Sequence, residues 1–124
     1  MNMNLAEAYN TVNTETMSGR NLEAEVLSKA ALKLQKCRDN WEDMDRNKNL
    51  DAALKFDQLL WCIFQAELAE KTNPLPEQLK IDLLKLSKFI DGRIFDIMAY
   101  PAKEKLTILI DINNNIADGL RLEP

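Results

Sequence analysis

The sequence predicts an all-α protein, a single small bundle of about five helices in one domain over residues 1–124. Apolar residues recur at intervals of three and four, and the alternating β-branched runs that indicate strands are absent. The chain has only 3 Gly and 4 Pro, so few positions interrupt the helical patterns. An apolar fraction of 46% is typical of a globular domain with its own core.

Two helices are predicted in the first third of the chain. A short helix is expected over residues 5–17, ended by Ser18-Gly19. Asn21 is a favourable N-cap for a second helix, and the polar residues 45–49 break its pattern. The predicted apolar stripes are Leu5, Tyr9 and Val12 in the first helix, and Leu22, Val26, Ala30, Leu34, Cys37, Trp41 and Met44 in the second.

The third helix is predicted from Asp51, which can cap it, to Glu70. Its apolar residues occupy both sides, which is typical of a helix at the centre of a bundle. One side carries Leu54, Trp61, Phe64 and Leu68, and the other carries Phe56, Leu59 and Ile63.

The fourth and fifth helices are separated by Tyr100-Pro101, because a residue before proline disfavours helical angles. Pro76 suits the first position of the fourth helix, and Gly92 inside it could allow a bend or a close contact. The fifth helix is predicted from Pro101 to Asp118, with Gly119 as its C-terminal turn. The main stripe of the fourth helix is Leu79, Leu83, Leu86, Ile90, Ile94 and Ile97.

The segment from Asp96 to Arg121 contains one polar residue on an apolar stripe. Leu106, Leu109, Ile110, Ile116 and Ala117 recur at helical spacing, and Asn113 lies among them. A buried amide is destabilising unless it is hydrogen-bonded, so this segment is expected to pack against a specific partner group.

No catalytic, cofactor or metal site is predicted. The chain has no His, the commonest general base and metal ligand. Its 2 Cys, Cys37 and Cys62, lack the spacing of a zinc site or a disulfide framework, and we expect structural thiols that are buried or half-buried. The segment Asp43–Asp51 alternates oxygen ligands as calcium loops do, but Lys48 stands where glycine is needed and Leu54 where glutamate is needed. We expect a polar loop whose Asn and Asp side chains bond the local backbone.

Two further groups of residues receive structural interpretations. Trp61 and Phe64, one turn apart, could stack on a ligand, but the apolar helix around them favours a place in the core. The basic residues of the second helix are flanked by acidic ones, which is typical of a solvated face: Lys29, Lys33, Lys36 and Arg38.

A surplus of apolar residues lies off the main stripes of the last two helices. Ile81, Leu84 and Phe95 lie off the stripe of the fourth helix, and Ile108 and Ile112 lie opposite that of the fifth. Such a second surface would pack either against the first helix or against another protein. The candidate partner-binding residues are Leu84, Phe95, Ile108 and Ile112.

Several short motifs run through the chain, most densely in its C-terminal half. They are Arg20 and Glu23 (R-x-x-E); Ala53-Leu54, Leu60-Trp61 and Phe64 (A-L…L-W-x-x-F); Asn73, Leu75, Pro76 and Leu79 (N-x-L-P-x-x-L); Leu86 and Phe89; Asp96-Ile97-Met98-Ala99; Leu109 to Asn113; and Ile116-Ala117 with Gly119-Leu120. In these positions the chain resembles the FlaF family of bacterial flagellar biosynthesis regulators. It departs from the family at Asp57, where Asn is frequent, and around Asp43–Asn49, where the loop differs.

The resemblance implies a cytoplasmic, non-enzymatic protein that promotes flagellin production. It further implies that flagellin, through its terminal helices, is a binding partner, with the companion regulator FlbT beside it. A regulator that contacts the flagellin message, and a homo-oligomeric adaptor such as a homodimer, are the alternatives. The net charge of −4 and the lack of a basic stripe argue against nucleic acid. No apolar run is long enough for a membrane span, and no signal-peptide pattern opens the chain.

Overall fold

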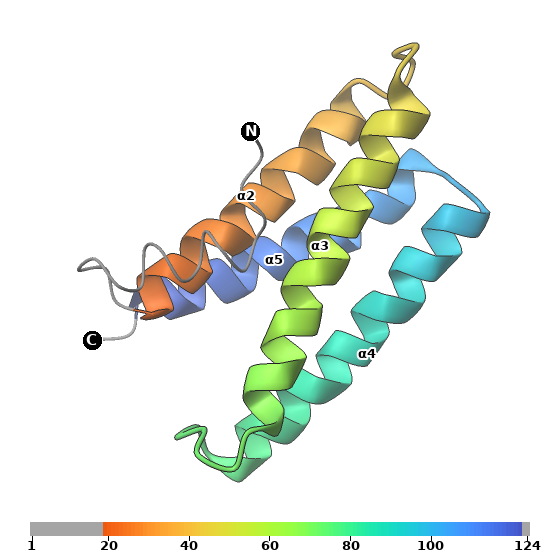
Figure 1. The fold of residues 1–124 in the computed structure, drawn as a ribbon. Coiled ribbons are helices and arrows are strands. Elements are labelled where there is room, and N and C mark those ends of the chain that lie inside the picture. Colours follow the sequence, from red (N-terminus) through yellow and green to blue (C-terminus); the bar gives the residue numbers. More distant parts are fainter. Residues whose placement is uncertain (1–18, 123–124) are drawn as a thin grey trace.

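The computed structural model describes residues 19–122, which form four α-helices and one 3-10 turn (Figure 1). The elements are α2 (Gly19–Asp39), α3 (Arg46–Ala69), α4 (Glu77–Ala99), η1 (Lys103–Lys105) and α5 (Leu106–Leu122). Within this part of the chain there is no strand, so the predicted all-α class is confirmed. The helix expected over residues 5–17 lies outside the described residues.

The helices form two pairs that diverge from one end of the molecule. α2 and α5 lie side by side and antiparallel, and α3 and α4 form an antiparallel hairpin (Figure 1). Arg38 near the end of α2 bonds Thr107 near the start of α5, whereas Arg121 near the end of α5 bonds Ser28 of α2. Toward the α3–α4 turn the hairpin runs away from the α2–α5 pair, so the bundle opens at that end.

The hydrophobic core lies where the two pairs meet. α2 contributes Ala24, Ala30 and Ala31, all fully or almost fully buried, and these small side chains let α5 approach closely. The larger side chains of the core that are almost completely buried include Leu27, Leu34, Leu54, Leu60, Trp61, Ile90, Ile94, Ile97, Leu106 and Leu109.

The central position predicted for the third helix is confirmed. α3 packs against both α2 and α4, and its Trp61 is hydrogen-bonded to α5. The side that carries Leu54, Trp61, Phe64 and Leu68 is buried. On its other side, Phe56 and Ile63 are half-buried against the core, while Leu59 is 44% exposed.

The connection between α2 and α3 differs from the prediction. α2 ends at Asp39, so Met44 is fully exposed instead of lying on the apolar stripe. α3 begins at Arg46, so Asp51 lies inside the helix and does not cap it. The Asp43 carboxylate accepts a hydrogen bond from the Asp45 backbone N–H at 2.8 Å, which tightens the turn and starts the helix earlier.

The polar loop expected over Asp43–Asp51 is found only in part: residues 46–51 lie inside α3, and within this segment the Asp43 side chain bonds the local backbone. Asp43 bonds its own turn, and the Asn40 side chain donates to the Lys36 carbonyl at 2.8 Å, in the last turn of α2. The Arg46 guanidinium also lies over the Trp41 ring, 4.4 Å from its centroid. Polar side chains and this cation–π contact therefore hold the connection between α2 and α3.

The other boundaries differ from prediction by a few residues. Asn21 lies inside α2, and Pro76 is the N-cap of α4 rather than its first helical residue. α5 begins at Leu106, after η1, because Lys105 bonds both the Tyr100 carbonyl and the Asp96 carboxylate across the break.

Gly119 does not form the C-terminal turn predicted for it, and Gly92 does not form the predicted close contact. Gly119 does not end the fifth helix: it lies inside α5 without a positive φ. Gly92 lies inside α4, and a Cβ added there would meet no atom within 4 Å. The close contact that Gly92 could have allowed is therefore not formed.

Candidate functional site

An apolar groove lies at the open end of the bundle, between the diverging helix pairs. It has a volume of about 220 Å³ and takes side chains from every helix and from the α3–α4 loop. Its apolar lining is contributed by Trp61, Phe64 and Leu68 of α3, Pro74 and Leu75 of the loop, Leu83 of α4, and Ile116 and Leu120 of α5. We call this feature the apolar groove.

The groove exists because the apolar stripe of α4 is longer than the core that it packs against. Ile90 is fully buried, Leu86 and Leu83 are half-buried, and Leu79 is 43% exposed. The exposure rises toward the α3–α4 turn, where the hairpin leaves α5 (Figure 1). The sequence therefore supplies apolar surface at this end that the described helices do not cover.

Trp61 and Phe64 form one wall of the groove. Their rings meet edge to face, with centroids 5.5 Å apart and an interplanar angle of 84°. Trp61 is 1% exposed and Phe64 7% exposed, so the prediction that this pair belongs to the core is confirmed. The two rings thus form an almost fully buried inner wall of the groove.

A buried polar network lies behind this wall. The Trp61 Nε1–H donates to Asn113 Oδ1 at 2.9 Å, and Asn113 Nδ2 donates to Asp57 Oδ1 at 2.8 Å. Asn113 and Asp57 are both fully buried. The expectation that the Asn113 amide must be hydrogen-bonded within a specific packing contact is confirmed, and the contact is between α5 and α3.

Asp57 is only partly satisfied in this network. Its Oδ2 is buried and has no hydrogen-bond partner. Burial disfavours the charged carboxylate and raises the pKa of Asp57 to about 7, although the hydrogen bond from Asn113 acts in the opposite direction. The core therefore contains a carboxyl group that titrates near neutral pH.

The rim of the groove is held by the Asn73 side chain. Its Nδ2 donates to the Glu67 carbonyl at the end of α3, and its Oδ1 accepts from the Leu75 backbone N–H, both at 3.0 Å. These bonds fix the loop and place Leu75 at the groove. Glu23 and Glu67 also line it, so the rim is acidic.

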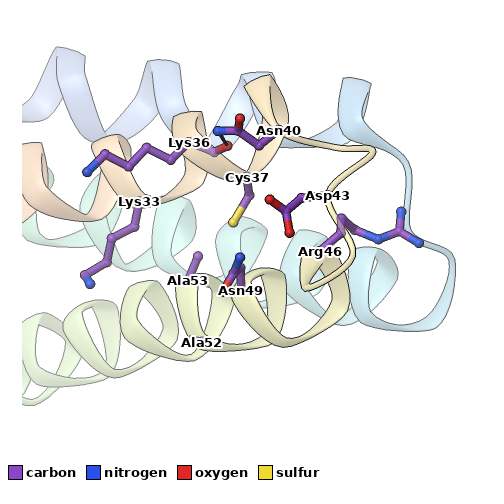
Figure 2. A pocket seen from close by; sticks show the side chains of 9 residues that line it. All are labelled: Lys33, Lys36, Cys37, Asn40, Asp43, Arg46, Asn49, Ala52 and Ala53. Atoms are coloured by element: carbon purple, nitrogen blue, oxygen red, sulfur yellow. Dashed lines mark hydrogen bonds between the residues drawn. The ribbon is translucent and has the colours of Figure 1, made fainter.

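A second, polar cavity of about 390 Å³ lies at the junction of α2 and α3 (Figure 2). Figure 2 shows Cys37 and Asp43 pointing into the space between the helices, while Lys36 extends along α2, Lys33 extends across toward α3 and Arg46 points outward. The cations therefore do not converge on one point, as an anion site would require. Burial raises the pKa of the Cys37 thiol, with Lys33 opposing the effect, so this thiol is not an activated nucleophile.

The two thiols differ in exposure. Both are free, and Cys37 is buried as expected, but Cys62 is exposed, contrary to the expectation of a buried or half-buried residue. It lies on the outer side of α3 because the core is on the opposite side of that helix. No group of three or more Cys, Asp or Glu residues within 19–122 has a metal-binding arrangement.

The predicted solvated face of α2 is exposed only in part. The ammonium groups of Lys29 and Lys33 lie 5.8 Å and 5.1 Å from the centroid of the Phe56 ring. These side chains thus cover an aromatic residue of α3.

The four residues predicted to bind a partner do not line the apolar groove. Phe95 is 71% exposed and lines a shallow cavity beside Leu59 and Cys62 on the outer side of the α3–α4 hairpin. Ile108 is 38% exposed and Leu84 is half-buried. Ile112 is half-buried and packs against the core.

The groove was not predicted from the sequence because its lining residues Trp61, Phe64, Leu68, Leu83 and Ile116 were assigned to main stripes, and every main stripe was treated as core. The available signal was the length of the α4 stripe. It starts at Leu79, only two residues after the helix begins at Glu77 and three turns before its first fully buried residue, Ile90.

The fold and the groove define a small all-α protein with an apolar recess between two helix pairs. A family model described as flagellar protein FlaF matches residues 5–120, and the chain belongs to this family. The searches of curated proteins and of solved structures return no match. Among the described residues, no helix is both long enough and apolar enough to cross a membrane.

Proposed function

We propose that this protein is a non-enzymatic regulator of flagellin production that binds a terminal helix of flagellin in the apolar groove, as a chaperone-like partner. Membership in a flagellar protein family supports the flagellar setting. The observation that carries the proposal is the apolar surface around Leu75, Leu83 and Leu120, which the helices of residues 19–122 leave uncovered at the open end of the bundle.

The shape of the groove is suited to an amphipathic helix. Helix-in-groove recognition needs an apolar recess between helices, into which residues one turn apart can insert. The recess here is bounded by helices on both sides and by a fixed loop at its end. The terminal segments of flagellin are amphipathic helices in the filament, and they must be kept from self-association before export.

The acidic character of the protein favours a protein partner over the flagellin message. The chain has a net charge of −4, and Glu23 and Glu67 line the groove itself. A net negative charge disfavours the approach of phosphate groups, whereas it favours basic side chains that flank an apolar helix face.

The test is calorimetric titration of peptides from the two ends of flagellin into the protein and its variants. Leu83→Gln and Leu120→Gln are expected to weaken binding at least tenfold, because burying each leucine contributes about 1.5–3 kcal/mol before association costs. Both residues are half-buried, so the fold should persist. Phe95→Gln, on the outer side of the hairpin, is the matched control and should bind normally.

Two results would contradict the proposal. If neither peptide binds at high micromolar concentration, flagellin is not the ligand of the groove. If Phe95→Gln weakens binding and the two groove variants do not, the partner surface is instead the one that includes Leu84, Phe95, Ile108 and Ile112.

A further inference from the structure

Trp61 belongs to two features at once. Its ring lines the apolar groove, and its Nε1–H is the first donor of the buried network that ends at Asp57. The indole and the Asn113 amide therefore form a hydrogen-bonded link between the groove and a buried carboxyl group. Replacing water in the groove by apolar side chains therefore changes the dielectric environment of this network.

The Asp57 carboxyl has no counter-charge. Among the described residues no salt bridge reaches it, and Oδ2 has no partner. A charge in this position is destabilised by burial and stabilised by a single amide donor, whereas the neutral acid carries only a dipole. The pKa of about 7 follows from this balance.

The charged groups of the surrounding elements are engaged elsewhere. On α3 itself, Lys55 pairs with Asp51, and on α2 the ammonium groups of Lys29 and Lys33 lie over the Phe56 ring. On α4, the Asp91 carboxylate accepts a hydrogen bond from Gln65. On α5, Arg121 bonds Glu25 and Asp118. The Glu23 and Glu67 side chains line the groove. None of these charged groups is a cause of the raised pKa of Asp57, which comes from burial opposed by the Asn113 hydrogen bond.

We propose, on the basis of the proposed function, that helix docking in the apolar groove is coupled to protonation of Asp57, so that the partner binds more tightly at lower pH. Apolar side chains of the docked helix replace water in the groove, in front of the almost fully buried Trp61 ring, and lower the dielectric around the network. The lower dielectric further disfavours the carboxylate relative to the neutral acid. By linkage, the docked helix raises proton affinity at Asp57, and the proton raises affinity for the helix.

The experiment is calorimetric titration of the flagellin terminal peptides at about pH 5.5 and about pH 8.5. Each pKa unit by which docking raises Asp57 makes binding about tenfold tighter at the lower pH. The Asp57→Asn variant should bind the same peptides without this pH dependence, which removes any contribution from titration of the peptide. Asp91→Asn removes a different carboxylate of the hairpin, one with a hydrogen-bond partner, and should retain the wild-type pH dependence.

A second measurement uses the protein without any peptide. The Trp61 indole N–H resonance should shift with pH around a midpoint near 7, and it should not do so in Asp57→Asn. The chain has 2 Trp, so the indole N–H resonance that remains in the Trp41→Phe variant is that of Trp61. An indole signal independent of pH overturns the inference.

The calorimetric outcomes separate this inference from the function on which it depends. Peptide binding with equal pH dependence in wild type and Asp57→Asn overturns the coupling and leaves the proposed function intact. Absence of peptide binding at every pH overturns both.

Discussion

Replacing Asp57 by Asn should change how the stability of the protein depends on pH. The substitution preserves the shape of the side chain and an oxygen that can accept the Asn113 hydrogen bond, but it removes the titrating group. Because Asp57 is fully buried and its Oδ2 is unpaired, ionisation places an uncompensated charge in the core.

The expected size of the effect follows from the pKa of Asp57. The folded state holds the proton more tightly than the unfolded chain, since the pKa rises from 3.8 to about 7 on folding. The contribution of the neutral acid to stability is therefore complete below about pH 3.8 and is lost as the pH rises through about 7. The gap between these values corresponds to roughly 4 kcal/mol in the free energy of unfolding.

The measurement is urea denaturation of both proteins, followed by circular dichroism, from about pH 5 to about pH 8. Near pH 5 the wild type has already lost roughly 2 kcal/mol of this contribution, because the unfolded chain is ionised there while folded Asp57 is still neutral. Between about pH 5 and about pH 8 the stability of the Asn variant relative to the wild type should therefore rise by roughly 3 kcal/mol. A difference in stability that stays constant over this range would show that Asp57 does not titrate there, and the reasoning would be wrong.

Three further predictions concern single residues. Trp61→Ala should destabilise the protein by about 3–5 kcal/mol through the cavity it leaves. Trp61→Phe should destabilise it by about 1–3 kcal/mol, because Asn113 Oδ1 loses its donor. Equal melting temperatures for Trp61→Phe and wild type would contradict this second value. Gly92→Ala should stabilise by about 0.5–1 kcal/mol, since the added Cβ meets nothing and φ is not positive; a lower denaturation midpoint would refute this. Cys62 should react with a maleimide in the native protein while Cys37 is protected until unfolding; mass spectrometry of the labelled peptides decides it.

The sequence was sufficient for the fold class and for the centre of the core. Helical spacing predicted the buried side of α3 and the buried Ile90, Ile94 and Ile97 of α4, because an apolar stripe on a helix must be shielded from water. The same pattern identified Asn113 as an amide that needs a specific partner. It could not identify that partner, since Asp57 and Trp61 lie on another helix and periodicity describes each helix alone.

The turn between α2 and α3 was predicted less well because side-chain bonds decide it. Met44 continued the apolar spacing of α2, but the Asp43–Asp45 bond and the Arg46–Trp41 contact start the next helix instead. The prediction that Gly119 ends the fifth helix was wrong for the converse reason. Glycine permits a left-handed turn but does not require one, and Arg121 beyond it holds the last turn of α5 against Ser28 of α2.

The apolar groove was not predictable because it depends on the angle between the helix pairs. An apolar stripe in the sequence shows that a helix has an apolar side, but it does not show over what length a neighbouring helix packs against that side. Leu79 and Ile90 belong to one stripe, yet the first is 43% exposed and the second fully buried. The difference arises where α3 and α4 leave α5 (Figure 1).

The register of α5 against α3 is best explained by the buried network. If α5 slid by one turn, an apolar residue such as Leu109 or Ile116 would replace Asn113, and both Asp57 and the Trp61 Nε1–H would lose their partner. Each buried group left unpaired costs about 1–3 kcal/mol, so displaced registers are disfavoured. Ile116 and Leu120 reach the groove only in the observed register, which means that the network also sets the lining of the groove. Asn113→Leu should therefore destabilise the protein and broaden the α5 amide resonances, as exchange between registers would; sharp resonances at wild-type stability would show that apolar packing alone fixes the register.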